Sequence, residues 1–529
     1  MNTINAVKTL PLGSLLLDKQ DKNYHNKLEI LNKIQEIADD FVLEENKSVD
    51  IGTKLAVIFT KESQDGIPRI VSDFAKLAQD SFEVVMLDWE SLTSFSGRFG
   101  EFIAKLNNEE VLEFAQAVLF VEEEDLVRFR GVYNIADFKS PEMLLEKLKT
   151  NKGLYSYKEM IGYQENACQY HHRREKHCTR CVNVCPTFGV GNNDSLMELV
   201  FSPIDCIACG ACVGVCPTNC LEYQELPKEG LGEMIGLLRG QKVFLCNVKD
   251  YASLVSQNQV LPDDFLPFVL PSLLMLNEND LLSIVQTSGY ALAVYMPYLS
   301  APMEFLNHIT QQIYKQDSVF LIQAMESLAQ ISSHLPQMES YLYQNRYNKP
   351  YRESFAQRLQ YMIKDEDYGL AKSVPPTQNR KESVFYGALE VDTQKCTLCL
   401  SCVGACNVNA LFARSDDFSL RFNASLCTTC GYCVSSCPEN AMTLQKEGIR
   451  LNPKTFRSQE LAKDEPFKCI ECGKVFSTKK SIDKVLSMLG SVFANDSQKL
   501  RTIQCCPDCK VKVMFGDNRI AQQGSANAR

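Results

Sequence analysis

Cysteine is the residue type whose number and spacing could carry chemistry in this sequence. The chain has 529 residues and 23 cysteines, and most of the cysteines lie in tight runs with two or three residues between neighbours. In a long chain that opens without an export signal, such runs favour metal or cluster ligation over disulfides. The thiolate is the ligating form, and a reducing compartment keeps it available.

Two runs in the C-terminal half have the ferredoxin-type spacing C-x2-C-x2-C-x3-C. They read CTLCLSCVGAC at 396–406 and CTTCGYCVSSCP at 427–438. Two-residue gaps let a tight loop wrap three corners of a [4Fe–4S] cube, and the fourth cysteine ligates the cube of the other run. The spacing therefore predicts two clusters. One takes Cys396, Cys399, Cys402 and Cys437, and the other takes Cys427, Cys430, Cys433 and Cys406.

The same layout occurs earlier in the chain, which indicates an internal duplication. A constant offset in residue number maps Cys178 onto Cys399 and keeps the later ligands of both runs in register. One ligand breaks the pattern, because the position equivalent to Cys396 is Glu175. Cys168, seven residues upstream, is the predicted substitute. One predicted cluster takes Cys168, Cys178, Cys181 and Cys216, and the other takes Cys206, Cys209, Cys212 and Cys185.

Other side chains compete for the corner that Cys168 would fill. They are His171, His172, His177 and Glu175, and a three-iron cluster that lacks this corner is a further alternative. Histidine ligation raises the potential of Rieske centres, so the identity of the ligand has functional weight. The cationic segment 171–176 is interpreted as a solvated loop, with a partner-docking surface as the alternative.

A third cysteine block lies near the C-terminal end of the sequence. It contains two CxxC pairs, Cys469/Cys472 and Cys506/Cys509, which are separated by the segment 473–505. All-thiolate tetrahedral ligation is typical of zinc ribbons, so we predict one structural zinc, with a fifth iron–sulfur cluster as the alternative. The first pair is similar to a nucleic-acid-binding finger, but the last histidine of the chain is His334, so the histidine pair of such a finger is absent.

Three cysteines remain outside these sets. Cys220 and Cys246 are interpreted as buried core thiols, because free cysteine often behaves as a small apolar side chain. Cys505 directly precedes a predicted zinc ligand, and the sequence assigns it no role.

Strands that alternate with helices surround the cysteine blocks and predict small α/β domains with parallel sheets. Helical spacing of apolar residues predicts a helix across 28–37, a second near 71–80, and a third before residue 116. No glycine-rich phosphate loop accompanies the strands predicted within 51–150, so no nucleotide site is predicted there. Six apolar runs have the composition of buried strands: 55–60, 82–87, 116–122, 242–246, 290–295 and 318–323.

The predicted fold class is therefore a multidomain α+β and α/β protein. It combines two 2[4Fe–4S] ferredoxin-like modules, small parallel-sheet α/β domains and a C-terminal zinc-ribbon-like module. The expected domains are a helical lead-in (1–50), an α/β domain (51–150), ferredoxin-like module 1 (160–226), a second α/β domain (240–340), ferredoxin-like module 2 (385–448) and the zinc-ribbon-like module (464–516).

Composition and charge exclude other classes of protein. Hydrophobic residues make up 45% and charged residues 23% of the chain, as in ordinary globular proteins. A net charge of −10 argues against a nucleic-acid partner, which would require a concentrated basic face. The most apolar stretch, 261–276, contains three prolines and two aspartates, so no transmembrane segment is expected. We therefore expect a soluble, cytoplasmic protein.

Four segments together resemble a known family. They are ACQYHHRREKHCTRCVNVCPT at 167–187, CIACGACVGVCPT at 206–218, CTLCLSCVGAC at 396–406 and DEPFKCIECGKVFST at 464–478. They resemble the large cytoplasmic 4Fe–4S ferredoxin proteins (polyferredoxin type) encoded beside proteobacterial molybdenum or tungsten formate dehydrogenases. In that family an isolated cysteine precedes CTRC, which implies that Cys168 is the missing ligand.

The resemblance covers roughly residues 162–515, with two departures. Segment 270–295 looks like the delta-subunit domain of methyl-viologen-reducing hydrogenases but lacks the cysteines of that domain, so the resemblance implies no redox role for it. Asn407 stands where the family usually has proline.

Together these features predict an iron–sulfur electron-transfer protein with four clusters on one chain. The resemblance implies a formate dehydrogenase, or a related oxidoreductase subunit, as the partner. No nucleophile–base pair, flavin fingerprint or open metal site indicates catalysis by the chain itself. The alternative function is an accessory or scaffold protein that assists assembly of the dehydrogenase or senses redox state.

Overall fold

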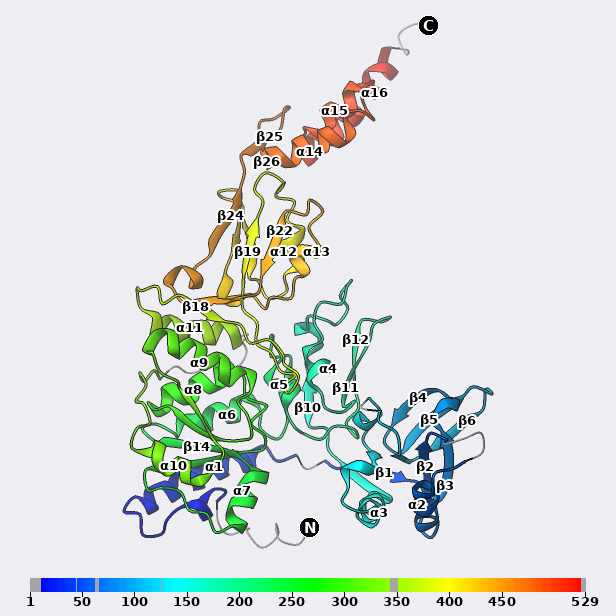
Figure 1. The fold of residues 1–529 in the computed structure, drawn as a ribbon. Helices are drawn as coiled ribbons and strands as arrows, with labels where there is room; N and C mark the ends of the chain where they lie inside the picture. Colours follow the sequence, from blue (N-terminus) through cyan, green and yellow to red (C-terminus); the bar gives the residue numbers. More distant parts are fainter. Residues whose placement is uncertain (1–10, 44, 62–65, 124, 343–350, 525–529) are drawn as a thin grey trace. The chain divides into compact units, whose positions relative to one another are not determined.

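The computed structural model describes residues 11–43, 45–61, 66–123, 125–342 and 351–524 (Figure 1). The fold is mixed α/β, with both parallel and antiparallel sheets. The chain divides into two compact units. Unit 1 contains Met1–Asn307, Gln316–Asn348 and Pro375–Ser383, and unit 2 contains His308–Lys315, Lys349–Val374 and Val384–Arg529.

A four-stranded parallel sheet lies near the N-terminal end of unit 1, in the order β3-β2-β7-β8. Its strands are β2 (Lys54–Phe59), β3 (Glu83–Asp88), β7 (Gln116–Leu119) and β8 (Val132–Asn134). The first three correspond to the strands predicted at 55–60, 82–87 and 116–122. On one face of the sheet, α2 (Arg69–Gln79) and α3 (Pro141–Thr150) share a buried core with Leu55 and Val57.

The other face of this sheet is covered by strands, so the helix expected before residue 116 is wrong. A three-stranded antiparallel sheet occupies that part of the chain: β4 (Leu92–Arg98), β5 (Glu101–Leu106) and β6 (Val111–Phe114). Buried Phe102 and Ala104 alternate with the exposed Lys105, which is the two-residue period of a half-buried strand. The buried side chains pack against Ala56 and Ile58 of β2.

The predicted lead-in is helical only in part. α1 (Tyr24–Asp40) buries Leu31 and Ile34 and contacts α6 (Lys228–Gly236). The last residues of the lead-in instead begin β1 (Lys47–Ile51), which pairs antiparallel with β9 (Gly153–Tyr157). Residues 1–10 and 44 of the predicted lead-in lie outside the described residues.

A second four-stranded parallel sheet lies in the middle of the chain, in the order β15-β14-β16-β17. Its strands are β14 (Lys242–Asn247), β15 (Phe265–Leu270), β16 (Leu292–Tyr295) and β17 (Val319–Ile322), with helices α7 (Val248–Ser256), α8 (Glu278–Ser288), α9 (Ala301–Tyr314) and α10 (Met325–Ser332). Three of these strands were predicted. The fourth, β15, contains Pro267 and lies at the edge of the sheet, where a strand tolerates proline.

Both cysteine blocks with ferredoxin spacing fold into two pairs of short antiparallel strands and two short helices. In unit 1 these are β10 (Ile161–Tyr163) with β13 (Leu221–Tyr223), β11 (Val190–Asn193) with β12 (Glu198–Phe201), α4 (Arg180–Val184) and α5 (Ala211–Gly214). In unit 2 these are β19 (Ala388–Val391) with β22 (Met442–Gln445), β20 (Leu411–Arg414) with β21 (Ser419–Phe422), α12 (Ser401–Ala405) and α13 (Tyr432–Ser435).

Further elements of unit 2 flank its cysteine block. The helices are α11 (Tyr351–Ile363), α14 (Lys479–Leu489), α15 (Ser497–Ile503) and α16 (Pro507–Gly524). The strands are β18 (Leu370–Lys372), which pairs with β23 (Gly448–Arg450), and β24 (Gln459–Lys463), which pairs with β21. A hairpin is formed by β25 (Pro466–Lys468) and β26 (Val475–Thr478). Within the described residues, no helix has both the length and the apolar character needed to cross a membrane.

Candidate metal centres

The first predicted ligand set of unit 2 lines a single pocket. Cys396, Cys399 and Cys402 come from one run, and Cys437 comes from the other. Cys402 lies on α12, whereas Cys437 follows the end of α13. The apolar side chains of Leu420 and Met442 complete part of the lining. The fourth sulfur is thus supplied by the neighbouring run, as crossover ligation requires.

The other three predicted sets are also brought together. In unit 2, the thiol of Cys433 interacts electrostatically with those of Cys427, Cys430 and Cys406. In unit 1, the thiol of Cys185 interacts electrostatically with those of Cys206, Cys209 and Cys212. The thiol of Cys178 interacts electrostatically with those of Cys168 and Cys216. Each of these sets therefore also combines sulfurs from separate parts of its block.

Burial keeps several of these thiols protonated in the free protein. Removal from water raises the pKa of Cys427 to about 11 and that of Cys402 to about 12. Ligation requires thiolates, so cluster insertion must release these protons. The sulfurs are preorganised in space, and bound iron would supply most of the positive charge that their thiolates need.

Backbone N–H groups point at the first cysteine of each run. The N–H of Ala208 donates to Cys206 Sγ at 3.4 Å, and that of Thr429 donates to Cys427 Sγ at 3.3 Å. Leu398 makes the same contact with Cys396. In all three cases the donor lies two residues after the acceptor and has a left-handed φ between 54° and 56°. These donors would stabilise ligating thiolates, and hydrogen bonds to cluster sulfur are one determinant of potential.

Strand register makes Cys168 equivalent to Cys396. Leu221 of β13 pairs with Tyr163 of β10. The offset that maps Cys178 onto Cys399 also maps Leu221 onto Met442 of β22, and Met442 pairs with Val391 of β19. Cys168 lies five residues after Tyr163, and Cys396 lies five residues after Val391. The seven extra residues of the first module therefore lie after Cys168, within 169–177.

A hydrogen bond supports the same equivalence. The N–H of Tyr170, two residues after Cys168, donates to Cys168 Sγ at 3.4 Å, as in the other three runs. Cys168 is 6% exposed, so its sulfur is shielded from water.

The competing side chains of the inserted loop have other contacts. His177 Nε2 lies 3.3 Å from Glu175 Oε2, and the Glu175 side chain is 60% exposed. His171 Nε2 lies 3.2 Å from Glu165 Oε2, and the His171 ring packs on the His172 ring with 4.0 Å between centroids. The two ring nitrogens of His171 are buried without a hydrogen-bond partner among the described residues, so the choice of Cys168 rests on the strand register and on its own N–H···Sγ contact.

Cys220 is buried, as expected of a core thiol, but it also contacts two predicted ligands. Its Sγ lies 3.4 Å from Cys216 Sγ, and it shares a hydrogen bond with Cys168. The equivalent position in the second module is Ala441, so a thiol there is not a requirement of the dicluster fold. The sequence did not indicate this contact, because Cys220 lies outside the cysteine spacing. Cys246 is fully buried at the end of β14, and burial raises its pKa to about 12.

Replacing Cys220 with alanine is expected to leave the iron content unchanged. The substitution recreates the side chain of Ala441, and the four predicted ligands of the cluster remain in place. Iron analysis and EPR spectra of the reduced protein, compared with those of the unmodified chain, would test this. Loss of one cluster's iron would show that Cys220 is itself a ligand.

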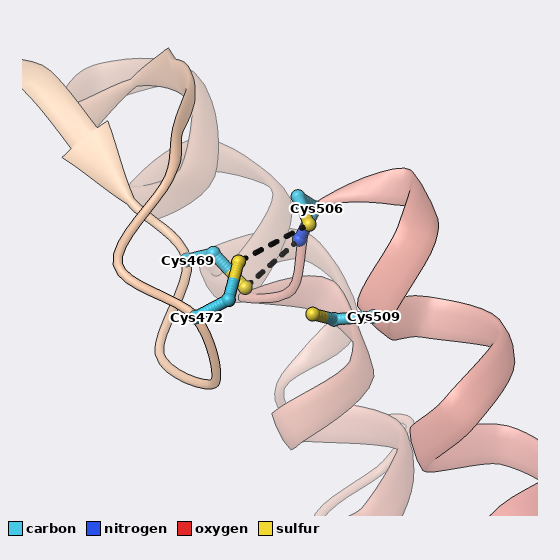
Figure 2. Close-up of side chains that lie close together, drawn as sticks. All are labelled: Cys469, Cys472, Cys506 and Cys509. Atoms are coloured by element: carbon cyan, nitrogen blue, oxygen red, sulfur yellow. Dashed lines mark hydrogen bonds between the residues drawn. The ribbon is translucent and has the colours of Figure 1, made fainter.

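Four C-terminal cysteines form a compact sulfur site (Figure 2). Cys469 and Cys472 lie on the loop between β25 and β26, Cys506 directly precedes α16, and Cys509 lies in the first turn of α16. The four Sγ atoms are all within 4.8 Å of one another, and those of Cys472 and Cys506 are 3.7 Å apart. Zn–S bonds of about 2.3 Å in a tetrahedral site place neighbouring sulfurs about 3.8 Å apart, so the geometry fits zinc.

The backbone also prepares this site for a cation. Burial opposes ionisation of Cys469, but nearby backbone N–H groups outweigh it and lower the pKa of this thiol to about 6. The strongest of these donors is the N–H of Cys506, at 3.3 Å from Cys469 Sγ. Cys469 would therefore be largely a thiolate at neutral pH, which is the ligand form.

The sulfur site is also the hydrophobic core of this segment. The buried residues of the core are Cys469, Cys505, Cys506 and Cys509, with Phe476 and Val513 packed against them. Cys505 is fully buried, and its Sγ donates to the carbonyl of Arg501 at 3.2 Å. It belongs to the core but not to the compact four-sulfur site.

Comparison with known families agrees with the two ferredoxin-type blocks. Residues 388–438 match the 4Fe–4S dicluster domain, and this range includes both runs of the second block. Residues 199–222 match the 4Fe–4S binding domain, and this range includes the second run of the first block. No curated protein matches the chain. The chain therefore contains two ferredoxin-type domains of the 4Fe–4S class.

Proposed function

We propose that this chain is an electron-transfer protein that carries four [4Fe–4S] clusters. The observation that carries the proposal is the strand register that makes Cys168 equivalent to Cys396. With Cys168 included, each module offers eight cysteines in two crossover sets. When bound, such clusters supply one-electron centres whose potentials depend on charge, hydrogen bonding and exposure.

The protein's own contribution is to hold and shield these centres. The loops fix the sulfur positions, the backbone N–H groups of Tyr170, Ala208 and Thr429 stabilise thiolate charge, and burial restricts access of water. A structural zinc held by Cys469, Cys472, Cys506 and Cys509 is also part of the proposal. Its support is the fit of the sulfur spacing to a tetrahedral site.

The iron content of the anaerobically purified chain tests the number of clusters. Four cubes require about sixteen iron atoms per chain, and the C-terminal site adds one zinc. Elemental analysis should give both values, and EPR spectra of the reduced protein should integrate to several one-electron centres. Fewer than about twelve irons after anaerobic reconstitution would rule out four clusters.

Formate dehydrogenase is the proposed redox partner. The support is the resemblance of the four cysteine-containing segments to ferredoxin proteins encoded beside such enzymes. A tagged chain recovered from its native host should co-purify with a molybdenum or tungsten enzyme, and formate should reduce its clusters only when that enzyme is present. Failure of formate to reduce the clusters in the complex would contradict the partnership.

A role in assembly or redox sensing is the second candidate. It is favoured by the two parallel-sheet domains, which contribute none of the predicted cluster ligands. A deletion strain distinguishes the two functions. A mature dehydrogenase that cannot pass electrons onward supports electron transfer, whereas a dehydrogenase that lacks its metal or is unstable supports assembly.

A further inference from the structure

Arg130 connects the N-terminal α/β domain to one predicted cluster site of unit 1. Its Nη1 atom donates to the carbonyl of Cys206 at 2.9 Å and to that of Ile204 at 3.2 Å. The guanidinium lies over the ring of Tyr155, 5.1 Å from the centroid. Cys206 is the first predicted ligand of its run, so a fixed positive charge lies beside that corner of the site.

Arg128 approaches the same site from the same segment. Its Nη2 atom donates to the carbonyl of Cys185 at 3.3 Å, and its guanidinium lies 4.5 Å from the ring centroid of Phe188. Cys185 is the crossover ligand predicted for the set that contains Cys206. Two guanidinium groups from the N-terminal domain therefore contact two backbone carbonyls of one predicted cluster site.

Arg352 occupies the equivalent place in unit 2, although it comes from a different element. It lies on α11, is 2% exposed, and donates through Nη1 to the carbonyl of Cys427. Its Nη2 atom donates to the carbonyl of Phe385 at 2.9 Å, and its guanidinium lies 3.8 Å from the ring centroid of Tyr386. Two carbonyls and an aromatic face thus fix its position.

The two cysteines whose carbonyls accept from these arginines, Cys206 and Cys427, hold the same position in the two modules. Cys427 is the counterpart of Cys206 under the constant offset that relates the two modules. Each guanidinium comes from outside the cysteine block, donates to the carbonyl of this cysteine and lies over a tyrosine. We propose that Arg130 with Arg128, and Arg352, raise the reduction potential of the cluster held at this corner of each module.

The electrostatic reason is simple, and it rests on the proposed four-cluster function. Reduction adds one electron, and hence one negative charge, to a cluster. A guanidinium remains positively charged throughout the physiological pH range. Its attraction for the added charge is stronger in protein surroundings than in water, because the effective dielectric constant is lower. The reduced cluster is therefore stabilised. The N-terminal domain and α11 would thus contribute charge, rather than ligands, to the redox sites.

Glutamine and lysine variants of the full-length protein separate charge from shape. Arg352→Gln and Arg130→Gln should each lower the midpoint potential of one cluster in an anaerobic, EPR-monitored titration with dithionite. We expect at least a tenfold shift of the reduction equilibrium, which is about 59 mV for one electron. Arg352→Lys and Arg130→Lys should retain most of the original potential, because the charge remains.

Exposed arginines provide the matched controls. Arg414 is 47% exposed and paired with Asp416, and Arg69 is 95% exposed on α2. Arg414→Gln and Arg69→Gln remove the same charge from each unit, but solvent screens it, so all potentials should stay in place.

Three results would overturn the proposal. The first is unchanged potentials in both glutamine variants with full iron content. The second is equal shifts in the lysine and glutamine variants, which would indicate a loss of shape. The third is loss of iron in both glutamine variants but not in the lysine variants, which would make the arginines structural. A wild-type chain with too little iron would instead contradict the four-cluster function, so the two failures are distinguishable.

Discussion

Replacing Cys506 with alanine is expected to abolish binding of the proposed zinc and unfold residues 467–515, while the iron content stays unchanged. The ligand cysteines are themselves most of the buried core of this segment, so little apolar packing remains without the metal. Structural zinc contributes on the order of 10 kcal/mol to the folding of small zinc domains. Hydrogen exchange by mass spectrometry should show loss of protection across these residues, and elemental analysis should show loss of zinc.

The neighbouring cysteine gives the matched control. Cys505→Ala removes a thiol that is fully buried beside Cys506 but lies outside the four-sulfur site. The cost should be about 1 kcal/mol for its hydrogen bond to the carbonyl of Arg501 and about 1 kcal/mol for the lost burial of its sulfur, and the zinc should remain bound. Equal loss of zinc in both variants would place Cys505 among the ligands. Recovery of iron in place of zinc from the unmodified segment would favour a fifth cluster.

Replacing Cys168 with alanine is expected to disrupt one cluster completely or convert it to a three-iron form. The register of β10 and the N–H···Sγ contact from Tyr170 give Cys168 the place of Cys396. Cys220 is the nearby thiol outside the set, so Cys168→Ala is best combined with Cys220→Ala to prevent replacement of the ligand. Between about one and four of the sixteen irons should be lost. Iron analysis measures the loss, and the EPR spectrum of the oxidised protein distinguishes a three-iron cluster from an empty site.

Substitutions in the inserted loop test three of the four side chains that compete with Cys168. Glu175→Gln, His171→Ala and His177→Ala should each retain all irons and leave the potentials of the other clusters in place. A full complement of iron in Cys168→Ala, together with loss of iron in one of these three variants, would assign the corner to that side chain.

The predicted ligand sets followed from the spacing of cysteines within each run and from the repetition of that spacing in the two blocks. Spacing within a run determines which sulfurs one loop can present, and the constant offset between the blocks relates the second set to the first. Glu175 broke the offset, and sequence alone left five candidates for the missing corner. The preference for Cys168 gained its structural support from strand pairing, because Tyr163 and Leu221 are far apart in sequence but adjacent in the sheet.

Local sequence patterns did not predict the three-stranded sheet, the strand β15 or the arginine contacts. The helix expected before residue 116 is a three-stranded sheet, in which buried Phe102 and Ala104 follow a two-residue alternation rather than a helical period. β15 was missed because Pro267 argues against a strand unless the strand is known to lie at an edge. Arg130 and Arg352 lie in no motif, and only the folded chain brings them to the equivalent cysteines Cys206 and Cys427.

The proline in β15 also affects how a newly made chain behaves before it acquires iron. An outer strand normally exposes a row of hydrogen-bonding groups that can recruit a strand from another molecule. Pro267 has no N–H to offer, and the segment around Gly13 lies so near that a Cβ at Gly13 would be 3.2 Å from Cγ of the proline. The N–H of Leu261, just before this strand, is bonded to the carbonyl of Leu16 at 2.8 Å. The proline and the neighbouring N-terminal segment thus leave this outer strand with fewer groups for pairing with a strand of another molecule, and neither feature involves a cluster ligand.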